Sequence, residues 1–150
     1  VTAGDKRLVN RGRIENFITD LKHAHKLNLT PGGNGARGYS SLPYPSYSNI
    51  VIEPGRDGRE GIIRGVSRGV LVEQFIGLGQ SNTLTGDFSG NLELAYLIEN
   101  GAVRGRVKDC MISGNLFTLL AGEIVLSAER ERIGAVLAPY VLFPSVNFTG

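Results

Sequence analysis

The dipeptide Asn100-Gly101 constrains the fold of this chain more than any other feature of the sequence. A two-residue type I′ turn needs positive φ at both central residues, and Asn-Gly adopts such a turn readily. The segment before it alternates, with apolar side chains on one face (Leu92, Leu94, Tyr96, Ile98) and charged ones on the other (Glu93, Glu99). We therefore predict a β-hairpin centred on this turn.

The turn also fixes the register of the two strands. The predicted pairs are Glu99 with Ala102, Ile98 with Val103, Tyr96 with Gly105, Leu94 with Val107 and Glu93 with Lys108. In this register apolar residues face apolar residues, and opposite charges face each other. A slip of one residue would turn the whole apolar face outward, because side chains alternate with a period of two.

Short elements are predicted before this hairpin. They are a hairpin over residues 7–18 turning at Arg11-Gly12, a short helix over 20–28 capped by Thr19 or Asp20, an irregular stretch over 28–48, a strand over 49–53, a short helix over 57–67 and a strand over 69–77. The tyrosines of the irregular stretch (Tyr39, Tyr44, Tyr47) indicate a loop that packs onto another surface.

After the central hairpin, the pattern predicts further strands. Residues 110–127 read as a strand, a helical turn near Phe117–Leu120 and a second strand. The charged run over residues 128–132 is predicted to be a turn, and residues 138–150 a final strand.

Glycine content supports an architecture of short strands. The chain has 21 glycines in 150 residues, about twice the usual share of ~7%. So many glycines favour tight turns over long helices. We predict a mainly β fold (α+β with minor helices), built of antiparallel sheets in a barrel-like sandwich of hairpins, with residues 1–150 as a single domain.

Charge and cysteine content narrow the classes of partner. Sixteen basic and 14 acidic residues are interspersed and give a net charge of +2, which does not favour a nucleic-acid partner. The single cysteine excludes an internal disulfide and fits a reducing compartment, so we expect a cytoplasmic protein. No apolar run approaches the ~18 residues that span a bilayer, so no membrane partner is expected. The chain begins at Val1 without an initiator Met and is expected to be a fragment of a longer protein.

The stretch over residues 79–91, GQSNTLTGDFSGN, gathers Gly, Asn, Ser and Thr around one carboxylate. Thr85 and Asp87 are its best hydroxyl–carboxylate pair. An Asp after Gly at the entrance of a strand nevertheless often bonds to its own backbone in a turn. On its residues alone, the stretch is predicted to be the corner that leads into the central hairpin.

The residue types and their spacing do not indicate a metal site or a catalytic nucleophile. His23 and His25 are the only histidines, and on a helix they point about 200° apart and cannot chelate together. Cys110 has no partnered base and is interpreted as a small buried hydrophobic residue. HExxH, CxxC and GxxxxGK[ST] are all absent from the sequence. We assign no catalytic residue and no metal ligand to this chain.

Several segments together resemble one known family. GRIENFITDLKHAHKLN, GGNGARGY, PSYSNIVIEPG, TGDFSGNLELAYLIENG, VKDCMISGNL and IGAVLAPYVLFPSVNFTG occur in the same order in the C-terminal domain of the TldD/PmbA family. The resemblance covers nearly the whole chain. The family is known for modulators of DNA gyrase and for metallopeptidases or their partner subunits.

The resemblance implies a mostly antiparallel β domain that packs behind an N-terminal part, in subunits paired around a cavity where extended peptides are cut. The corner would face this cavity, so Asn82, Thr85 and Asp87 are candidates for contact with peptide or partner. A corner with no contact role remains the alternative. Thr83 departs from the family, which often has Pro at this position.

The resemblance also implies where zinc would be held. Family metal ligands come from an upstream HExxxH helix and from a cysteine in a CGKxGQ-like stretch near the C-terminus. This sequence has neither motif: the corresponding C-terminal stretch reads EIVLSAERERIGAV, and Cys110 lies on an earlier segment. This pattern is similar to that of the metal-free PmbA (TldE-like) subunit. Zinc would then belong to an upstream domain or to a partner subunit.

Three hypotheses for function follow from the resemblance. In the first, the chain helps to build the peptide-binding cavity of a TldD-like partner, or of a homodimer, that cuts unfolded peptides. In the second, it is the non-catalytic half of a self-sufficient zinc metallopeptidase. In the third, it is a regulatory module that binds gyrase or nucleic acid through the arginines of residues 56–68 (Arg56, Arg59, Arg64, Arg68).

Overall fold

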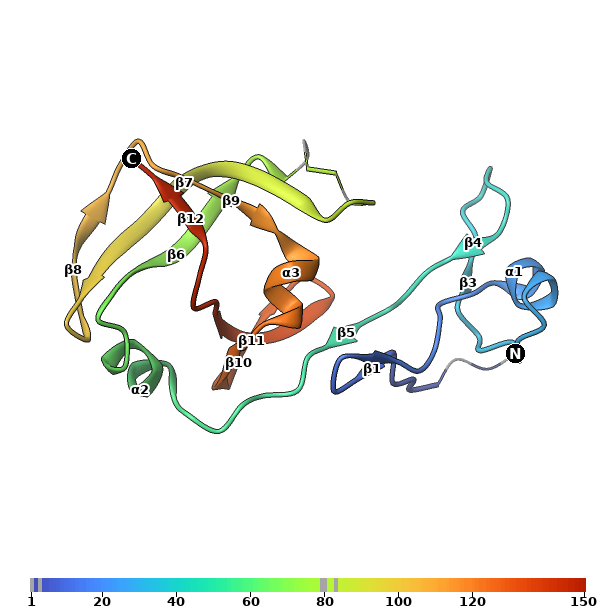
Figure 1. Cartoon of the computed structure of the whole chain (residues 1–150). Coiled ribbons are helices and arrows are strands. Elements are labelled where there is room, and N and C mark those ends of the chain that lie inside the picture. Colours follow the sequence, from blue (N-terminus) through green and yellow to red (C-terminus); the bar gives the residue numbers. More distant parts are fainter. Residues whose placement is uncertain (1, 3, 79–80, 83) are drawn as a thin grey trace. The chain divides into compact units, whose positions relative to one another are not determined.

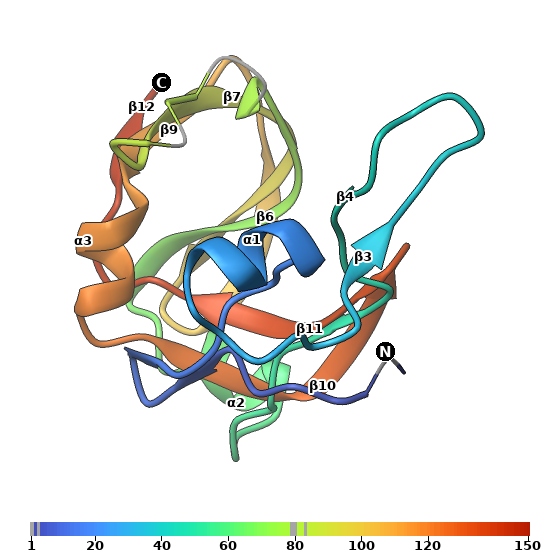
Figure 2. The same cartoon turned by 90° about the vertical axis from the view of Figure 1, so that its right-hand side faces the viewer.

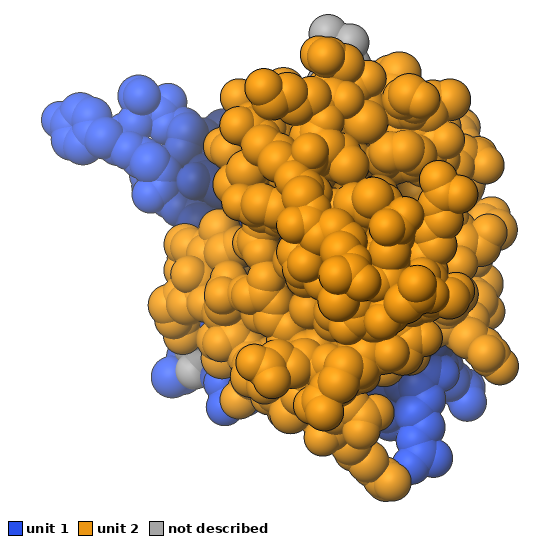
Figure 3. Space-filling view, turned by 90° about the vertical axis from the view of Figure 1, so that its left-hand side faces the viewer, with its two compact units in different colours: residues 1–50 blue, residues 51–150 orange. Residues whose placement is uncertain are grey.

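The computed structural model describes residue 2 and residues 4–78, 81–82 and 84–150. It divides into two compact units, residues 1–50 and residues 51–150 (Figures 1 and 3). Each unit is described by itself.

The first unit opens with the predicted hairpin. Strands β1 (Val9–Asn10) and β2 (Arg13–Ile14) are antiparallel, with Val9 opposite Ile14 and Asn10 opposite Arg13. Arg11 and Gly12 form the turn with φ of 48° and 77°. The positive φ at both residues is the requirement of a two-residue hairpin loop, so the prediction is confirmed.

A capped helix follows this hairpin. Helix α1 (Leu21–Lys26) begins at Asp20, whose carboxylate accepts a hydrogen bond of 2.7 Å from the His23 N–H. This bond is the largest cause that lowers the Asp20 pKa below its ordinary value. Of the two predicted caps, Asp20 is therefore the one used, while Thr19 and Ala24 are buried beside it.

The stretch predicted as irregular, residues 28–48, contains one pair of very short strands. β3 (Gly35–Ala36) pairs antiparallel with β4 (Tyr44–Pro45). The tyrosines do not pack within the described residues: Tyr39 is fully exposed, and Tyr44 and Tyr47 are half exposed, so their packing onto another surface stays a prediction. The strand predicted over residues 49–53 is present as β5 (Ile50–Val51).

The second unit is built on a five-stranded antiparallel sheet (Figure 2). Its strands are β6 (Arg68–Ile76), β7 (Asp87–Glu99), β8 (Ala102–Val107), β9 (Met111–Asn115) and β12 (Asn147–Thr149). The order is β12-β9-β7-β6. The long strand β7 pairs with β9 along its first half and with β8 along its second half.

The central hairpin has the predicted turn and the first two of the five predicted pairs. Asn100 and Gly101 have φ of 50° and 73°, and the pairs Glu99–Ala102 and Ile98–Val103 are as predicted. Beyond them the register shifts by one residue, so that Tyr96 lies opposite Arg106 and Ala95 opposite Val107. The predicted pairs of Tyr96, Leu94 and Glu93 are therefore wrong. A β-bulge places Arg104 and Gly105 against the single residue Leu97.

Irregularities in pairing also alter the predicted apolar face of β7. Leu92 and Ile98 are buried as predicted, whereas Leu94 and Tyr96 are only half-buried and Ala95 is fully buried. The pairing of β6 with β7 shifts between Val72 and Phe75 as well. The buried residues Leu92, Ala95 and Cys110 form the core, packed by Val70, Phe75, Val107 and Ile112.

Two short helices and a second hairpin complete this unit. Helices α2 (Arg59–Arg64) and α3 (Leu116–Ala121) fall where short helices were predicted. The charged run 128–132 is not a turn but part of β10 (Val125–Ile133), which forms a hairpin with β11 (Val136–Leu142). The turn lies at Gly134-Ala135, where Gly134 has φ of 59°. The predicted final strand is divided by Pro144 into β11 and β12, which belong to different sheets.

These sheets confirm a mainly β, antiparallel fold with small helices. Among the described residues no sheet closes into a barrel, so the barrel-like part of the prediction is not met. Helix α3 runs from the end of the five-stranded sheet toward the β10–β11 hairpin (Figures 1 and 2). No helix in the described parts of the chain is long and apolar enough to span a membrane.

Candidate contact site at the entrance to β7

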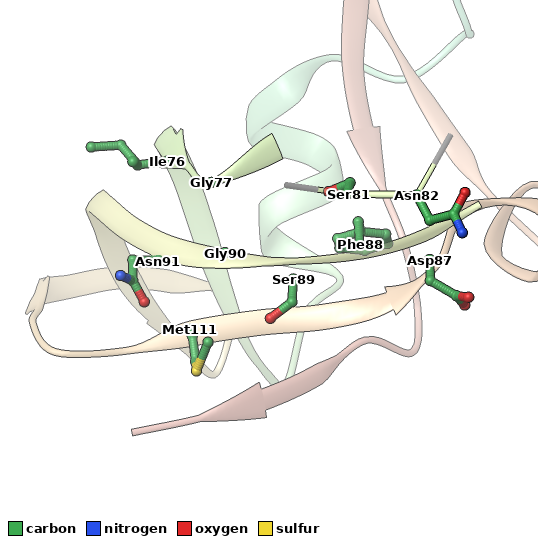
Figure 4. Close-up of a pocket in the computed structure, with 10 residues that line it drawn as sticks. All are labelled: Ile76, Gly77, Ser81, Asn82, Asp87, Phe88, Ser89, Gly90, Asn91 and Met111. Carbon is green, nitrogen blue, oxygen red and sulfur yellow. The ribbon is translucent and has the colours of Figure 1, made fainter. Parts of the chain in front are cut away.

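A pocket of about 530 Å³ lies where the chain enters β7 (Figure 4). It is lined by Ile76, Gly77, Ser81, Asn82, Asp87, Phe88, Ser89, Gly90, Asn91 and Met111. Asp87, Ser89, Asn91 and Met111 point to one side of the sheet in this view, and Phe88 points to the other. Two of the three predicted contact residues, Asn82 and Asp87, thus line the pocket.

Asp87 is held by two side chains. Asn115 Nδ2 donates to its Oδ1 over 2.8 Å, and Thr85 Oγ1 donates to its Oδ2 over 2.7 Å. The bond from Asn115, followed by that from Thr85, lowers the pKa of the Asp87 carboxyl below its ordinary value. A carboxylate held in its charged form in this way is a poor general base at neutral pH.

Asn82 organises the turn before the strand. Its Oδ1 accepts from the N–H of Leu84 over 3.0 Å and from that of Thr85 over 3.3 Å. Its own N–H donates to the Asp87 carbonyl over 3.0 Å. An asparagine side chain that bonds the backbone two and three residues later is typical of a turn. The corner prediction is therefore confirmed for the described residues. Gly79, Gln80 and Thr83, which belong to the same predicted stretch, lie outside those residues.

The structure therefore brings Asn82, Thr85 and Asp87 together but engages much of their hydrogen-bonding capacity within the corner. Asn115 completes the group and was missed from the sequence. Its Nδ2 also donates to the Thr85 carbonyl over 2.8 Å, and its Oδ1 accepts from the Thr118 N–H over 3.1 Å as the N-cap of α3. An Asn directly before the apolar run LFTLLA is an N-cap signal that could have identified it.

A second, larger hollow of about 770 Å³ lies elsewhere in the same unit. Its lining is mostly aliphatic and comes from α2, β6, β11 and the segment before β12. Among the lining residues, Arg59 donates to Glu73 over 2.5 Å and to the Tyr140 hydroxyl over 3.1 Å, and its guanidinium lies 4.3 Å from the Tyr140 ring centre. Tyr140 in turn donates to Glu131, which raises its pKa. The arginine joins helix α2 to strands of two sheets.

The histidines and the cysteine in the described part of the chain do not fit a zinc site. His23 Nδ1 lies 2.7 Å from Asp20 Oδ1, and both histidines are on helix α1. Cys110 is buried just before β9, where its Sγ bonds the Lys108 carbonyl over 2.9 Å. Within the described residues, no three His, Cys, Asp or Glu side chains lie close enough to hold a metal ion.

Comparison with known proteins decides the family. The model of the PmbA/TldA metallopeptidase C-terminal domain matches residues 1–150, the whole length of the chain. The chain belongs to the TldD/PmbA metallopeptidase family.

Two relatives show how much of a family member this domain represents. An uncharacterized protein of Methanocaldococcus jannaschii is 32% identical over 91% of this chain, which spans 31% of that protein. A metalloprotease TldD homolog of Buchnera aphidicola subsp. Schizaphis graminum is 30% identical over 72% of the chain and 22% of its own length. The chain thus spans between about a fifth and a third of these relatives.

Two solved structures have the same fold over nearly the whole chain. TldE from Thermococcus kodakarensis superposes with a TM-score of 0.84 at 30% identity, covering 95% of this TldD/PmbA domain and 33% of that protein. A Thermotoga maritima protein named as a modulator of a DNA gyrase gives a TM-score of 0.85 at 27% identity, covering 99% and 34%.

Proposed function

We propose that residues 1–150 act as the single C-terminal domain of a PmbA (TldE-like) subunit, which binds no metal and builds part of a cavity for unfolded peptides. A TldD-like subunit, or a second copy in a homodimer, supplies the remaining wall. In the leading form of the proposal the TldD-like subunit holds the zinc and cuts the peptide. The free cysteine fits a cytoplasmic location for this complex.

The chemistry of the corner carries this proposal. Asp87 is its one carboxylate, and each of its oxygens accepts a hydrogen bond, one from Asn115 and one from Thr85. These bonds lower its pKa and make it a weak base, which favours a role in shaping the wall over the activation of water. The sequence also has no cysteine in the C-terminal stretch where the family places a ligand.

A cleavage assay tests the proposal. The natural full-length protein is mixed with the TldD-like subunit of the same organism, and cleavage of an unfolded peptide is followed with and without zinc. We expect cleavage only when both subunits and zinc are present. Equal cleavage by the TldD-like subunit without this protein would contradict the proposal.

The alternative is a self-sufficient zinc metallopeptidase of which this domain is the non-catalytic half. The metalloprotease name of the Buchnera relative, 30% identical, favours it. In the same assay, cleavage by this full-length protein alone, lost with a zinc chelator, would establish this alternative.

The third hypothesis, a regulatory module that binds gyrase or nucleic acid, is supported by the name of the Thermotoga relative. Of the arginines that prompted it, Arg59 is paired with Glu73 and stacked on Tyr140, so its charge is already engaged. Duplex DNA binding that persists at physiological salt would be needed to support this module.

A further inference from the structure

The dipeptide Asn-Gly occurs twice in this chain, as Asn34-Gly35 and as Asn100-Gly101. Asparagine is a chemically labile residue, and a following glycine makes it most labile because glycine has no Cβ to shield its main-chain nitrogen. In this reaction the glycine nitrogen loses its proton and bonds to Cγ of the asparagine, and the side-chain nitrogen leaves as ammonia. Water then opens the resulting succinimide ring to aspartate or isoaspartate.

At Asn100 the attacking nitrogen is already engaged. The Gly101 N–H donates to the Val66 carbonyl over 2.9 Å, and the Asn100 N–H donates to the Ser67 carbonyl over 2.7 Å. Both carbonyls belong to the segment where helix α2 ends, residues 64–67, which we call the α2 exit. The Gly101 nitrogen can lose its proton to the reaction only after the bond to Val66 opens.

Close packing and strand pairing hold the same turn in place. A Cβ on Gly101 would lie 2.6 Å from the Arg64 carbonyl oxygen, so the turn lies tightly against the α2 exit. On the other side, the pair Glu99–Ala102 closes the hairpin. Ring closure needs rotation of the main chain between Asn100 and Gly101, and these contacts oppose that rotation.

At Asn34 the attacking nitrogen points away from its partner strand. The Ser46 N–H donates to the Asn34 carbonyl over 2.7 Å, so these two residues form a hydrogen-bonded pair beside the β3–β4 ladder. Bonded and non-bonded pairs alternate along an antiparallel ladder. Gly35, opposite Pro45, therefore directs its N–H away from β4, and Gly35 is exposed.

A cation is bonded to the side chain of Asn34. Lys6 Nζ donates to Asn34 Oδ1 over 2.8 Å. Negative charge develops on this oxygen when the Gly35 nitrogen attacks Cγ, and a cation already bonded to the oxygen stabilises that charge. The bond thus favours the reaction at Asn34.

We propose that Asn34 is a site of spontaneous deamidation in the folded protein and that the α2 exit protects Asn100 from the same reaction. The inference does not rest on the proposed function, because each environment is built from contacts within a single unit of the chain. Protection matters at Asn100, since isoaspartate would add one atom to the main chain of the two-residue loop that joins β7 to β8.

Ageing of the natural full-length protein tests the proposal. The protein is incubated at mildly alkaline pH, folded or in denaturant, and the modification of each Asn-Gly peptide is followed by mass spectrometry. Similar rates are expected at both copies in denaturant. In the folded protein Asn34 should react at least about tenfold faster than Asn100, because Asn100 reacts only from a locally opened state. Equal rates in the folded protein, or faster reaction at Asn100, would overturn the inference.

Lys6→Met tests the role of the cation. It removes the ammonium from Asn34 and should slow modification there several-fold, with the rate at Asn100 unchanged. Lys22→Met is the matched control, since Lys22 is exposed on helix α1, and both rates should stay as in the wild type. An unchanged rate at Asn34 in Lys6→Met would refute the part assigned to the cation.

Ile63→Ala tests the protection by the α2 exit. Ile63 belongs to α2 and lines the aliphatic hollow, so its truncation should loosen the helix. Modification of Asn100 and hydrogen exchange of the Gly101 amide should then accelerate together. Ile133→Ala, at a residue 74% exposed at the end of β10, should change neither rate. Exchange at Leu92 and Ala95 checks that each variant is folded, and faster exchange at Gly101 without faster modification of Asn100 would contradict the protection.

Discussion

For Asp87, the sequence predicts the position in a turn, whereas only the structure identifies both of its hydrogen-bond partners. The position of Asp87 after Gly86 predicts a turn carboxylate, and the bond from Thr85 two residues away is local. The bond from Asn115 joins positions 28 residues apart and depends on the pairing of β7 with β9. Local spacing can predict the first bond, whereas the second follows only from the sheet.

Replacement of Asn115 by alanine should destabilise the corner and α3 together. The substitution removes the N-cap of α3 and the hydrogen bond to Asp87, so the free energy of unfolding should fall by about 1–2 kcal/mol. Chemical denaturation measures the change. Thr118→Ala, which removes only the long 3.4 Å bond of the Thr118 hydroxyl, is the control and should change stability much less. Equal losses in both variants would contradict the role of Asn115.

Asp87 should also contribute a pH-dependent part of stability. Since its pKa in the folded protein is lowered from 3.8, its contribution is complete above that value and is lost as pH falls through the folded pKa. The difference in unfolding free energy between the wild type and Asp87→Asn should therefore shrink as the pH falls below about 4. Carboxyl NMR titration gives the folded pKa directly, and a value at or above 3.8 would refute the hydrogen-bonded arrangement.

At the scale of elements, the central hairpin shows what periodicity can predict. Alternation and the Asn-Gly turn place β7, the turn and the first two pairs correctly. The bulge at Arg104 and Gly105 lies beyond them, because a bulge depends on how the neighbouring strands twist and pack. The same limit applies to β10. The charges of residues 128–132 predict a turn, but these residues lie in a strand, because strand residues exposed to water can be charged.

Gly101 should tolerate no side chain, for two separate reasons. Its φ is 73°, and a Cβ there would lie 2.6 Å from the Arg64 carbonyl oxygen at the end of α2. Gly101→Ala should lower the free energy of unfolding by about 2–4 kcal/mol, measured by chemical denaturation. Gly105→Ala in the same hairpin is the matched control, because no atom lies within 4 Å of its Cβ position. That variant should be neutral or slightly stabilised, and equal losses in both would contradict the packing of α2 on the turn.

At the scale of the whole molecule, the chain is one part of what its relatives contain. It spans about a third or less of the Methanocaldococcus protein and of the TldE structure. Within the second unit several large apolar side chains are exposed, among them Leu84, Phe117 and Ile133. Exposed apolar side chains that gather on one surface often mark a contact with another part of a protein or with a partner. Composition could not predict this exposure, because the apolar fraction of the chain is ordinary.

The central claim is that the chemistry of peptide cleavage belongs to another subunit. Elemental analysis of zinc in the purified full-length protein, alone and in complex with the TldD-like subunit, tests it most directly. The account predicts that zinc accompanies the TldD-like subunit and is absent from this protein alone. One tightly bound zinc per chain in this protein alone would contradict it.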